Sequence, residues 1–508
     1  MKKYANIINF ARGCEPRAED DSYLLPTLKN ELELCGRLGL RSTVLLQYDA
    51  LVREGYRDLC RQYEDEIEIG LWLEIVEPLC EKAGIRWNGR YEWDWKIDCN
   101  ITVAYTKEER ARLADAAFEG FREYFGYYPG VAGCWIIDAF TLDYINEKYK
   151  PDAFCVCRDQ YGTDGMTLWG GVYNGGYYPS KKNMIVPARE RKDQIDLPVF
   201  RMLGPDPLYQ YDIGLGSPEE RQGVSTLEPV YPYGGGSEKW VDWYFRENYG
   251  NPALSHAYAQ FGQENSFGWD DIGGPLEMQL KKLREKEKSG GIEVLTLGET
   301  GRRFKAAYDE TPVNSLLTLT DWKGEGNKGL WYYSKYYRVN VYSDGKRVWI
   351  RDLQLYSDDF EQDHLNTVCK ANRCAAFALP VIDGFRFSQG SVRAGLYPCI
   401  AGEVIKTARF NAKELDERSI RLDCSEIGFT LLEDRIVVDM PAEAELKFVY
   451  ADLPYIPYKS HDEKMLRLNF SGFDGRSFDY ELKLEKGSYT GSGSIKGEDG
   501  EAILLLKV

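Results

Sequence analysis

Two hydrophobic patterns divide the chain near residue 310. From residue 4 to about 308, short apolar runs alternate with segments whose apolar residues recur every three or four positions. Such alternation of strands and helices predicts a parallel sheet covered by helices, and about eight strands favour a closed (β/α)7-8 barrel. The predicted strands lie within 5–12, 42–48, 65–75, 131–138, 152–159, 197–203, 253–263 and 292–297.

Turn and capping signals refine this picture. Thr106 and Glu109 have the spacing of a capping box, which predicts a helix that ends near Gly126. The "YGGGS" stretch at 233–237 lacks the ending of a phosphate-binding loop, so we expect a turn in which Ser237 caps the next helix. The irregular stretch 160–195 is too long for an ordinary connector, and such loops tend to be functional.

Beyond residue 311 the apolar positions alternate with period two, and turns are frequent. A hairpin is predicted around Asp344–Gly345. We therefore predict an α/β protein with two domains, a (β/α) barrel over 1–310 and an all-β sandwich over 311–508.

The charge balance narrows the choice of partners. The formal net charge of −17 predicts repulsion from nucleic acid and from anionic membrane surfaces. No apolar run approaches the roughly 20 residues needed to span a bilayer. The first residues are interpreted as a strand and not as a signal peptide. We expect no nucleic-acid or membrane partner and a cytoplasmic location, and we leave a homo-oligomer open.

Cysteine and histidine usage points away from a metal centre. The 12 Cys are scattered in apolar surroundings and are expected to be small core residues. Cys155 and Cys157 would face the same side of a strand, either for packing or with further ligands for a metal. Three His in 508 residues leave little material for a zinc site or a His-based triad. We expect no metal and no cofactor.

The carboxyl ends of the predicted strands supply the candidate chemistry, because barrels of this type place their active sites there. Carboxylates, Trp and Arg are concentrated at these ends. Glycoside hydrolysis needs two carboxylates, aromatic platforms and polar donors for hydroxyl groups. As catalytic residues we predict Asp138 and Glu264. As substrate-binding residues we predict Arg12, Glu15, Asp49, Trp72, Glu74, Trp93, Asp94, Asp159, Gln160, Trp169, Tyr178, Arg201, Glu228, Gln263, Asn265, Trp269 and Asp270.

Each main candidate also has a purely structural interpretation. Asp138 could cap the helix that follows it, and Glu264 could belong to a buried hydrogen-bond network. Glu74 could be solvated or could pair with Arg86 or Arg90, and Asp159 could pair with Arg158. The aromatic content of 14% fits a carbohydrate site or simply a Tyr-rich β domain.

Several stretches resemble known families. "LPTLKNELELCGRLGLRSTVLLQYDAL" followed by "DEIEIGLWLEI" looks like the opening of the glycoside hydrolase/deacetylase superfamily of (β/α)7 barrels. Polysaccharide deacetylases bind a metal there through an Asp and two His, whereas "EIGLW" has no His, which disfavours that activity. "GCWIID" resembles the Gly-x-Trp-x-x-Glu nucleophile motif of glycoside hydrolase family 57, with Asp138 in place of Glu. "GQENSFGWDD" corresponds to the acid/base region of that family, with Glu264 as candidate and Asp270 as rival.

The most extensive resemblance is to an uncharacterised bacterial two-domain family that is common in gut bacteria. It rests on "CRDQYGTDGMTLWGGVYNGGYYPSKKN", "VFRMLGPDPLYQYD", "GGGSEKWVDW" and "AQFGQENSFGW", and it implies a barrel followed by a β domain.

These patterns lead to one main prediction of function. We expect a metal-independent glycoside hydrolase that acts on an oligosaccharide or glycoconjugate through two carboxylates, with Asp138 as nucleophile and Glu264 as acid/base. The alternatives are a non-catalytic glycan-binding protein on a degenerate barrel, or a carbohydrate lyase or isomerase.

Overall fold

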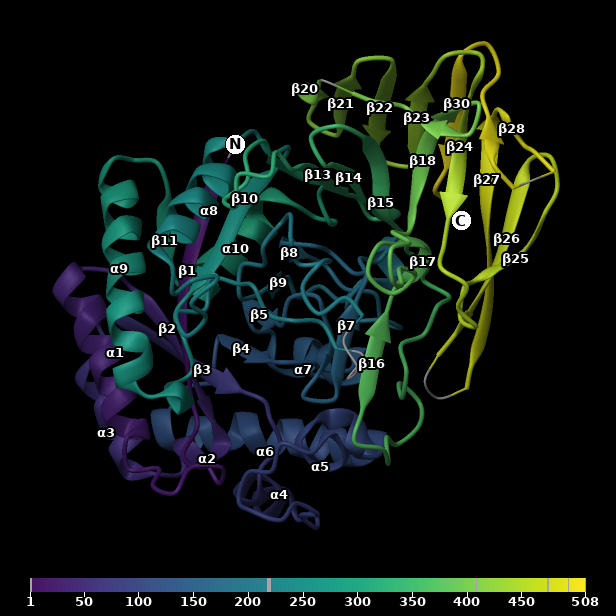
Figure 1. Ribbon diagram of the computed structural model, residues 1–508. Helices are drawn as coiled ribbons and strands as arrows, with labels where there is room; N and C mark the ends of the chain where they lie inside the picture. Colours follow the sequence, from purple (N-terminus) through teal and green to yellow (C-terminus); the bar gives the residue numbers. More distant parts are fainter. Residues whose placement is uncertain (1, 217–220, 408, 473–474, 492, 508) are drawn as a thin grey trace.

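A nearly closed, barrel-like sheet forms the core of the N-terminal part in the computed structural model (Figure 1), which describes residues 2–216, 221–407, 409–472, 475–491 and 493–507. Within these residues the strand order is β10-β1-β2-β3-β4-β5-β9-β8, and β11 also pairs with β1. All neighbours are parallel except β8, which is antiparallel to β9. The strands are β1 (Lys2–Ala11), β2 (Ser42–Gln47), β3 (Ile67–Trp72), β4 (Val131–Cys134), β5 (Ala153–Val156), β8 (Gly175–Tyr177), β9 (Val199–Arg201), β10 (His256–Phe261) and β11 (Glu293–Leu295).

Side-chain hydrogen bonds join the two edges of this sheet. The Gly176 N–H of β8 donates to His256 Nε2 at the start of β10 (3.3 Å), and Asn174 Nδ2 donates to the Tyr258 carbonyl (2.8 Å). Both edges are thereby tied together without a backbone ladder. The predicted strands of the N-terminal part are confirmed as strands, but the one predicted over 131–138 ends at Cys134, and β8 was not predicted.

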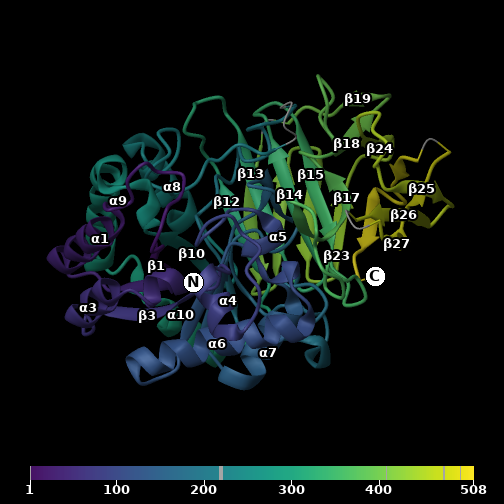
Figure 2. The same cartoon turned by 90° about the horizontal axis from the view of Figure 1, so that it is seen from below.

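Helices cover the outer face of the sheet (Figures 1 and 2). The predicted capping boxes and caps form as expected: Thr106 and Glu109 begin α6, and Ser237 begins α8. The helices are α1 (Leu24–Leu38), α2 (Tyr48–Leu51), α3 (Glu54–Gln62), α4 (Glu77–Ala83), α5 (Ile97–Asn100), α6 (Lys107–Phe125), α7 (Ala139–Tyr149), α8 (Glu238–Gly250), α9 (Trp269–Lys288) and α10 (Leu297–Ala307).

The C-terminal part consists of antiparallel sheets whose inner residues share one hydrophobic core. One sheet has the order β12-β13-β14-β15-β18-β24-β29-β28, with β17 and β19 at its side. Its strands are β12 (Asn314–Thr318), β13 (Lys328–Tyr333), β14 (Tyr337–Ser343), β15 (Val348–Leu355), β17 (Leu379–Asp383), β18 (Gly395–Ile400), β19 (Glu403–Val404), β24 (Ala444–Val449), β28 (Ser488–Tyr489) and β29 (Ile495–Lys496). The hairpin predicted at Asp344–Gly345 joins β14 to β15.

The other sheet has the order β20-β21-β22-β23-β30-β27-β26-β25. Its strands are β20 (Asn411–Asp416), β21 (Ser419–Cys424), β22 (Ile427–Leu432), β23 (Arg435–Asp439), β25 (Tyr458–His461), β26 (Met465–Ser471), β27 (Ser477–Lys486) and β30 (Glu501–Leu505). The antiparallel architecture predicted from the period-two pattern is confirmed, whereas the sandwich arrangement and the boundary at residue 310 stay predictions.

A small sheet connects the two parts of the chain. The strands β6 (Gln160–Thr163) and β7 (Met166–Trp169) form a hairpin, and β7 pairs in parallel with β16 (Cys374–Phe377). The irregular stretch 160–195 therefore serves in part to attach the C-terminal sheets to the barrel. All 12 Cys are buried and unpaired, as expected of core residues.

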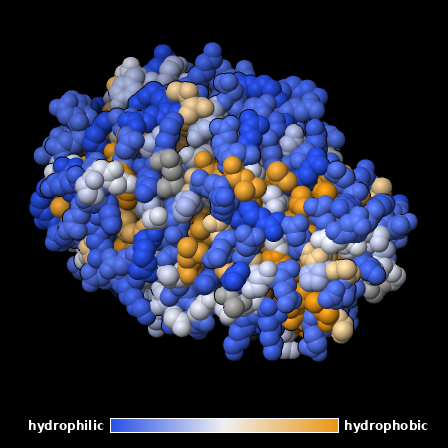
Figure 3. Space-filling model, turned by 90° about the horizontal axis from the view of Figure 1, so that it is seen from above, coloured by the Kyte–Doolittle hydropathy of each residue, from blue (hydrophilic) through white to orange (hydrophobic). Residues whose placement is uncertain are grey.

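The face of the molecule seen from above is largely polar (Figure 3). Figure 3 shows a face that is mostly hydrophilic, with separate groups of hydrophobic residues, which fits the net charge of −17. Across the described residues, no helix is both long enough and apolar enough to cross a membrane.

Candidate active site

A cavity of about 390 Å³ lies at the carboxyl ends of the barrel strands. Residues that follow six strands of the barrel line it, namely Arg12, Glu74, Trp135, Arg158, Leu203 and Glu264. Loops add acidic, basic and aromatic side chains, including Glu15, Arg17, Tyr23, Trp93, Trp95, Gln160, Glu228 and Tyr231. Seven of the predicted site residues are thus brought together: Arg12, Glu15, Glu74, Trp93, Gln160, Glu228 and Glu264.

Arg12 is the central cation of this cavity. Its Nη2 lies 3.3 Å from Glu74 Oε2 and 3.2 Å from Glu264 Oε2, and its Nη1 lies 3.7 Å from Glu15 Oε2. Burial disfavours the charge, but these three carboxylates and that of Asp49 outweigh this and raise the pKa of Arg12 above its usual value. Because Glu74 and Glu264 contact the same nitrogen, their oxygens can be no farther apart than the sum of those two distances.

Glu264 and Glu74 differ in their remaining partners. Glu264 Oε1 accepts a hydrogen bond from Ser266 Oγ (2.6 Å), and its Oε2 contacts only Arg12 among the described residues. Glu74 also accepts from the indole N–H of Trp72 (3.1 Å). Burial raises the pKa of Glu74 although Arg12 and Trp72 oppose this effect. Glu74 therefore pairs with Arg12 and not with Arg86 or Arg90.

The hydrogen-bond partners of Glu228 are neutral. Its Oε2 accepts from Thr226 Oγ1 (2.8 Å), and its Oε1 accepts from Gln263 Nε2 (3.4 Å). Burial raises the pKa of Glu228 to about 7, against smaller opposing effects of Thr226 and Arg158. A carboxyl group of this kind can hold a proton near neutral pH and release it to a ligand.

Stacked cations and indoles form one wall of the cavity. The guanidinium of Arg12 lies 4.0 Å from the ring centre of Trp93, and that of Arg17 lies 4.9 Å from Trp93 and 5.6 Å from Trp95. Arg17 also donates to both oxygens of Glu15 (2.7 and 2.6 Å). Burial acts against the charge of Glu15, but these bonds prevail and lower its pKa.

Asp138 does not line this cavity. It is fully buried at the N-terminus of α7, where its side chain accepts from the Thr141 N–H (3.0 Å), Thr141 Oγ1 (2.6 Å) and Thr102 Oγ1 (2.6 Å). Arg110 Nη1 completes this set at 3.1 Å. The capping interpretation of Asp138 is confirmed, and the described contacts leave its oxygens engaged in stabilising the fold. The structure thus brings Glu264 to the cavity without the predicted partner.

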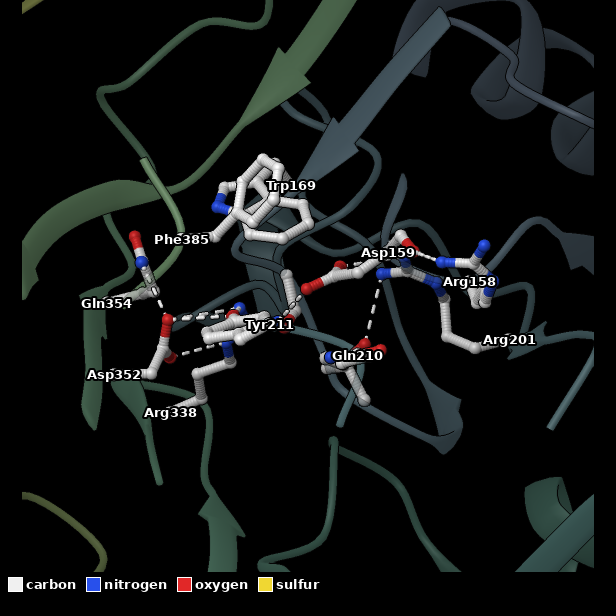
Figure 4. A network of polar contacts seen from close by, with 12 residues as sticks. Arg158, Asp159, Trp169, Arg201, Gln210, Tyr211, Arg338, Asp352, Gln354 and Phe385 are labelled. Atoms are coloured by element: carbon white, nitrogen blue, oxygen red, sulfur yellow. Dashed lines mark hydrogen bonds and ion pairs between the residues drawn. The ribbon is translucent and has the colours of Figure 1, made fainter. Parts of the chain in front are cut away.

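Asp159, Arg201 and Trp169 belong to a buried polar network between the barrel and the C-terminal sheets (Figure 4). Asp159 pairs with Arg201 (3.0 Å) and Arg338 (2.5 Å), and not with the side chain of Arg158. Trp169 donates its indole N–H to Asp383 (2.7 Å). These partners hold all three predicted site residues away from the cavity.

The other predicted residues also have structural partners outside the cavity lining. Asp49 accepts backbone N–H groups of Gly13, Cys14 and Ala50, and Asp94 pairs with Arg90. Trp72 stacks on Phe10, and Tyr178 donates to the Tyr308 carbonyl. Asn265 forms hydrogen bonds with the backbone of Arg12 and of Leu24, and Gln263 donates a hydrogen bond to Glu228. Trp269 and Asp270 line a separate hollow at the start of α9. Their substrate-binding roles stay predictions that the cavity does not support.

Several cavity residues were missed in the sequence, among them Tyr23, Trp95, Asn100, Trp135, Arg158, Thr163, Asp164, Tyr231 and Phe267. Trp135 and Arg158 follow β4 and β5, so the strand-end rule could have selected them. The loop residues carry no comparable signal.

One group of described residues has donors close enough to share a metal ion. Cys14, Asp49 and Glu92 each offer an atom within 4.8 Å of the others. However, Asp49 already accepts backbone N–H groups, and Glu92 pairs with Arg53 at 2.8 Å.

Comparisons with known proteins identify the fold. No family model matches the chain, and no match is found among curated proteins. Among solved structures, the chain is similar to a provisionally assigned glycoside hydrolase/deacetylase from Parabacteroides distasonis, with 16% identity and a TM-score of 0.50 over 74% of this chain and 90% of that one. This similarity shows a shared barrel-like fold.

More distant matches add no argument. The 4-alpha-glucanotransferase from Thermococcus litoralis aligns over 99% of this chain and 97% of that one, with 10% identity and a TM-score of 0.33. Puue allantoinase aligns over 61% of this chain and 92% of that one, with 11% identity and a TM-score of 0.37.

Proposed function

We propose that the chain is a metal-independent glycoside hydrolase that acts on an oligosaccharide or glycoconjugate through two carboxylates. The observation that carries this proposal is that Glu228 and Glu264 line the same cavity and differ in their partners. Glu228 has neutral partners and a raised pKa, whereas Glu264 contacts the cation Arg12. Acid-assisted glycoside cleavage requires two carboxyl groups, one of which keeps its proton near neutral pH, and the raised pKa of Glu228 suits that role.

In this mechanism Glu228 is the general acid. It donates its proton to the glycosidic oxygen as the bond from that oxygen to the anomeric carbon breaks. The proton leaves with the departing alcohol. Gln263 and Thr226 hold the carboxyl group in place without supplying a positive charge that would favour its ionised form.

Glu264 is the second carboxylate. It either attacks the anomeric carbon or removes a proton from the water that does so, and water finally adds its hydroxyl group to that carbon. Arg12 contacts both Glu264 and Glu74 and so fixes the position of Glu264 in the cavity. This assignment keeps Glu264 as predicted, while Glu228 replaces Asp138 as its partner.

The walls of the cavity suit a sugar ring. The aromatic side chains of Trp93, Trp95, Trp135 and Tyr231 line the cavity, and Asn100 and Gln160 offer polar groups for hydroxyls. The volume of about 390 Å³ lies within the usual range for small-ligand sites, roughly 300–1,000 Å³.

The test is a screen of chromogenic α- and β-glycosides beside a glycan array. Turnover with release of the aglycone supports the hydrolase, and the configuration of the first-formed sugar, followed by NMR, shows retention or inversion. Glycan binding without turnover supports the alternative, a binding protein on a degenerate barrel. That alternative has one specific observation behind it, the direct contact of Arg12 with Glu264, which makes the carboxylate less nucleophilic.

The raised pKa of Glu228 predicts a pH dependence. Because the acid must carry its proton, kcat/KM should fall as the pH rises through about 7, by about tenfold per unit well above that value. Glu228→Gln should lose this alkaline limb, together with most of the activity on glycosides whose alcohol is a poor leaving group. The measurement is kcat/KM from pH 5 to pH 9, with Glu15→Gln as a matched cavity variant that should retain the limb. An unchanged alkaline limb in Glu228→Gln would assign the titration to another group.

A further inference from the structure

Three arginines line the cavity, and they differ in how their charge is compensated. Arg12 contacts three carboxylates, and Arg17 is paired with Glu15. No carboxylate oxygen of the described residues lies within ion-pair distance of Arg158, although only 1% of its surface is exposed. Burial of an unpaired cation costs free energy, and an anionic ligand bound in the cavity would offset that cost.

The hydrogen bonds of Arg158 leave one edge of its guanidinium unused. Nη1 donates to the Asp159 carbonyl and to Gln222 Oε1 (3.1 Å). Nε has no hydrogen-bond partner among the described residues, and no bond of Nη2 is recorded there. Nε and Nη2 together form the edge that binds a carboxylate through two parallel hydrogen bonds.

Arg201 provides a direct comparison on the neighbouring strand. It is equally buried, but its Nε, Nη1 and Nη2 donate to the Cys157 carbonyl, the Val172 carbonyl and Asp159 (2.7, 3.0 and 3.0 Å). Figure 4 shows both arginines beside Asp159. Each side-chain nitrogen of Arg201 therefore has a hydrogen-bond partner, whereas Nε of Arg158, a residue that lines the cavity, has none among the described residues.

We infer that Arg158 binds an anionic group of the ligand, and that the site takes an acidic sugar, a uronic acid whose carboxylate pairs with the open edge of Arg158. The inference deepens the proposed function and rests on it for the reaction, but binding can be measured without turnover. A sulfate ester would offer related acceptor oxygens. The planar carboxylate matches two parallel donors better, so we commit to the uronic acid.

The experiment compares ligands that differ only at C6. Binding of glucuronic and glucose 4-nitrophenyl glycosides, of the corresponding galactose pair, and of their 6-sulfates is measured by calorimetry with wild type, Arg158→Met and Arg158→Lys. We expect wild type to prefer a uronide over its neutral partner. Loss of one partner of a buried charge pair should reduce that preference at least about 30-fold in Arg158→Met. Arg158→Lys should retain part of it, because the charge remains without the fork.

Stability supplies a second readout that a merely structural role would not give. Without ligand, Arg158→Met should leave the apparent Tm unchanged or raise it, since it removes a buried charge that has no ion-pair partner. The matched variant Arg201→Met should lower the Tm, because it leaves the buried carboxylate of Asp159 with Arg338 as its one ion-pair partner among the described residues.

The outcomes separate this inference from the proposed function. Uronide binding that depends on Arg158 but occurs without turnover upholds the inference and overturns the hydrolase. Turnover of neutral glycosides, without a preference for uronides, upholds the hydrolase and overturns the inference about Arg158. Preference for the 6-sulfates, equal binding of acidic and neutral sugars, no binding of any uronide, or a preference unchanged in Arg158→Met overturns the assignment of a uronic acid.

Discussion

Glu264→Gln is expected to lower kcat by at least about 100-fold on whichever glycoside the wild-type protein cleaves. The amide keeps the size of the side chain and can still accept from Ser266, but it cannot act as nucleophile or base. The free energy of unfolding should change little in comparison, because Arg12 retains Glu74 and Glu15 as partners. Steady-state kinetics and thermal unfolding of the same preparations separate the two effects.

Glu228→Gln should differ from Glu264→Gln in its dependence on the leaving group. A general acid matters most when the departing alcohol is a poor leaving group, so the loss should be large for alkyl glycosides and small for nitrophenyl glycosides. Glu264→Gln should impair both kinds of substrate. If Glu228→Gln lowers kcat/KM equally for both, Glu228 is not the proton donor.

Asp138→Asn is the control for both variants, because Asp138 is also a buried carboxylate but does not line the cavity. Arg110, Thr102 and Thr141 engage its oxygens, so the substitution should reduce stability while kcat per folded molecule stays close to that of wild type. Loss of turnover in a folded Asp138→Asn protein, with Glu228→Gln still active, would restore Asp138 as the catalytic partner of Glu264.

The strand-end rule explains why so much of this site could be predicted from sequence. Apolar runs of parallel strands are nearly continuous, so the first polar residue after each run marks the edge where the cavity forms. Arg12, Glu74 and Glu264 were found in this way, and they do meet in one cavity. The rule cannot say which of these side chains remain accessible to a ligand.

The failures of the rule share one physical cause. Asp138 is neutralised by Arg110 on α6, and Asp159 by Arg338 on β14, and neither contact has a local sequence signal. Arg158 and Arg201 occupy similar positions at their strand ends, yet only Arg201 is saturated by partners. Compensation of a buried charge depends on distant residues, so it becomes visible only once the chain is folded.

The same dependence makes the network around Asp159 a sensitive point of the fold. Asp159 is fully buried between Arg201 and Arg338, and Arg338 continues to Asp352 at 2.8 Å. Figure 4 shows that these side chains link the barrel to the C-terminal sheets. Asp159→Asn would leave two buried guanidinium groups with one carboxylate, Asp352, which contacts only one of them.

We therefore expect Asp159→Asn to lower the free energy of unfolding by about 3–5 kcal/mol, the usual effect of breaking a buried ion pair. The exposed pair Lys459–Asp479 provides the control, since Asp479→Asn should change the free energy of unfolding by less than about 0.5 kcal/mol. Urea denaturation at fixed pH measures both. The double variant Asp159→Asn/Arg338→Met should be less destabilised than the sum of its single variants, because each removes the same contact. A change below about 1 kcal/mol in Asp159→Asn, accompanied by a raised KM in the folded protein, would instead return Asp159 to the substrate-binding role predicted from the sequence.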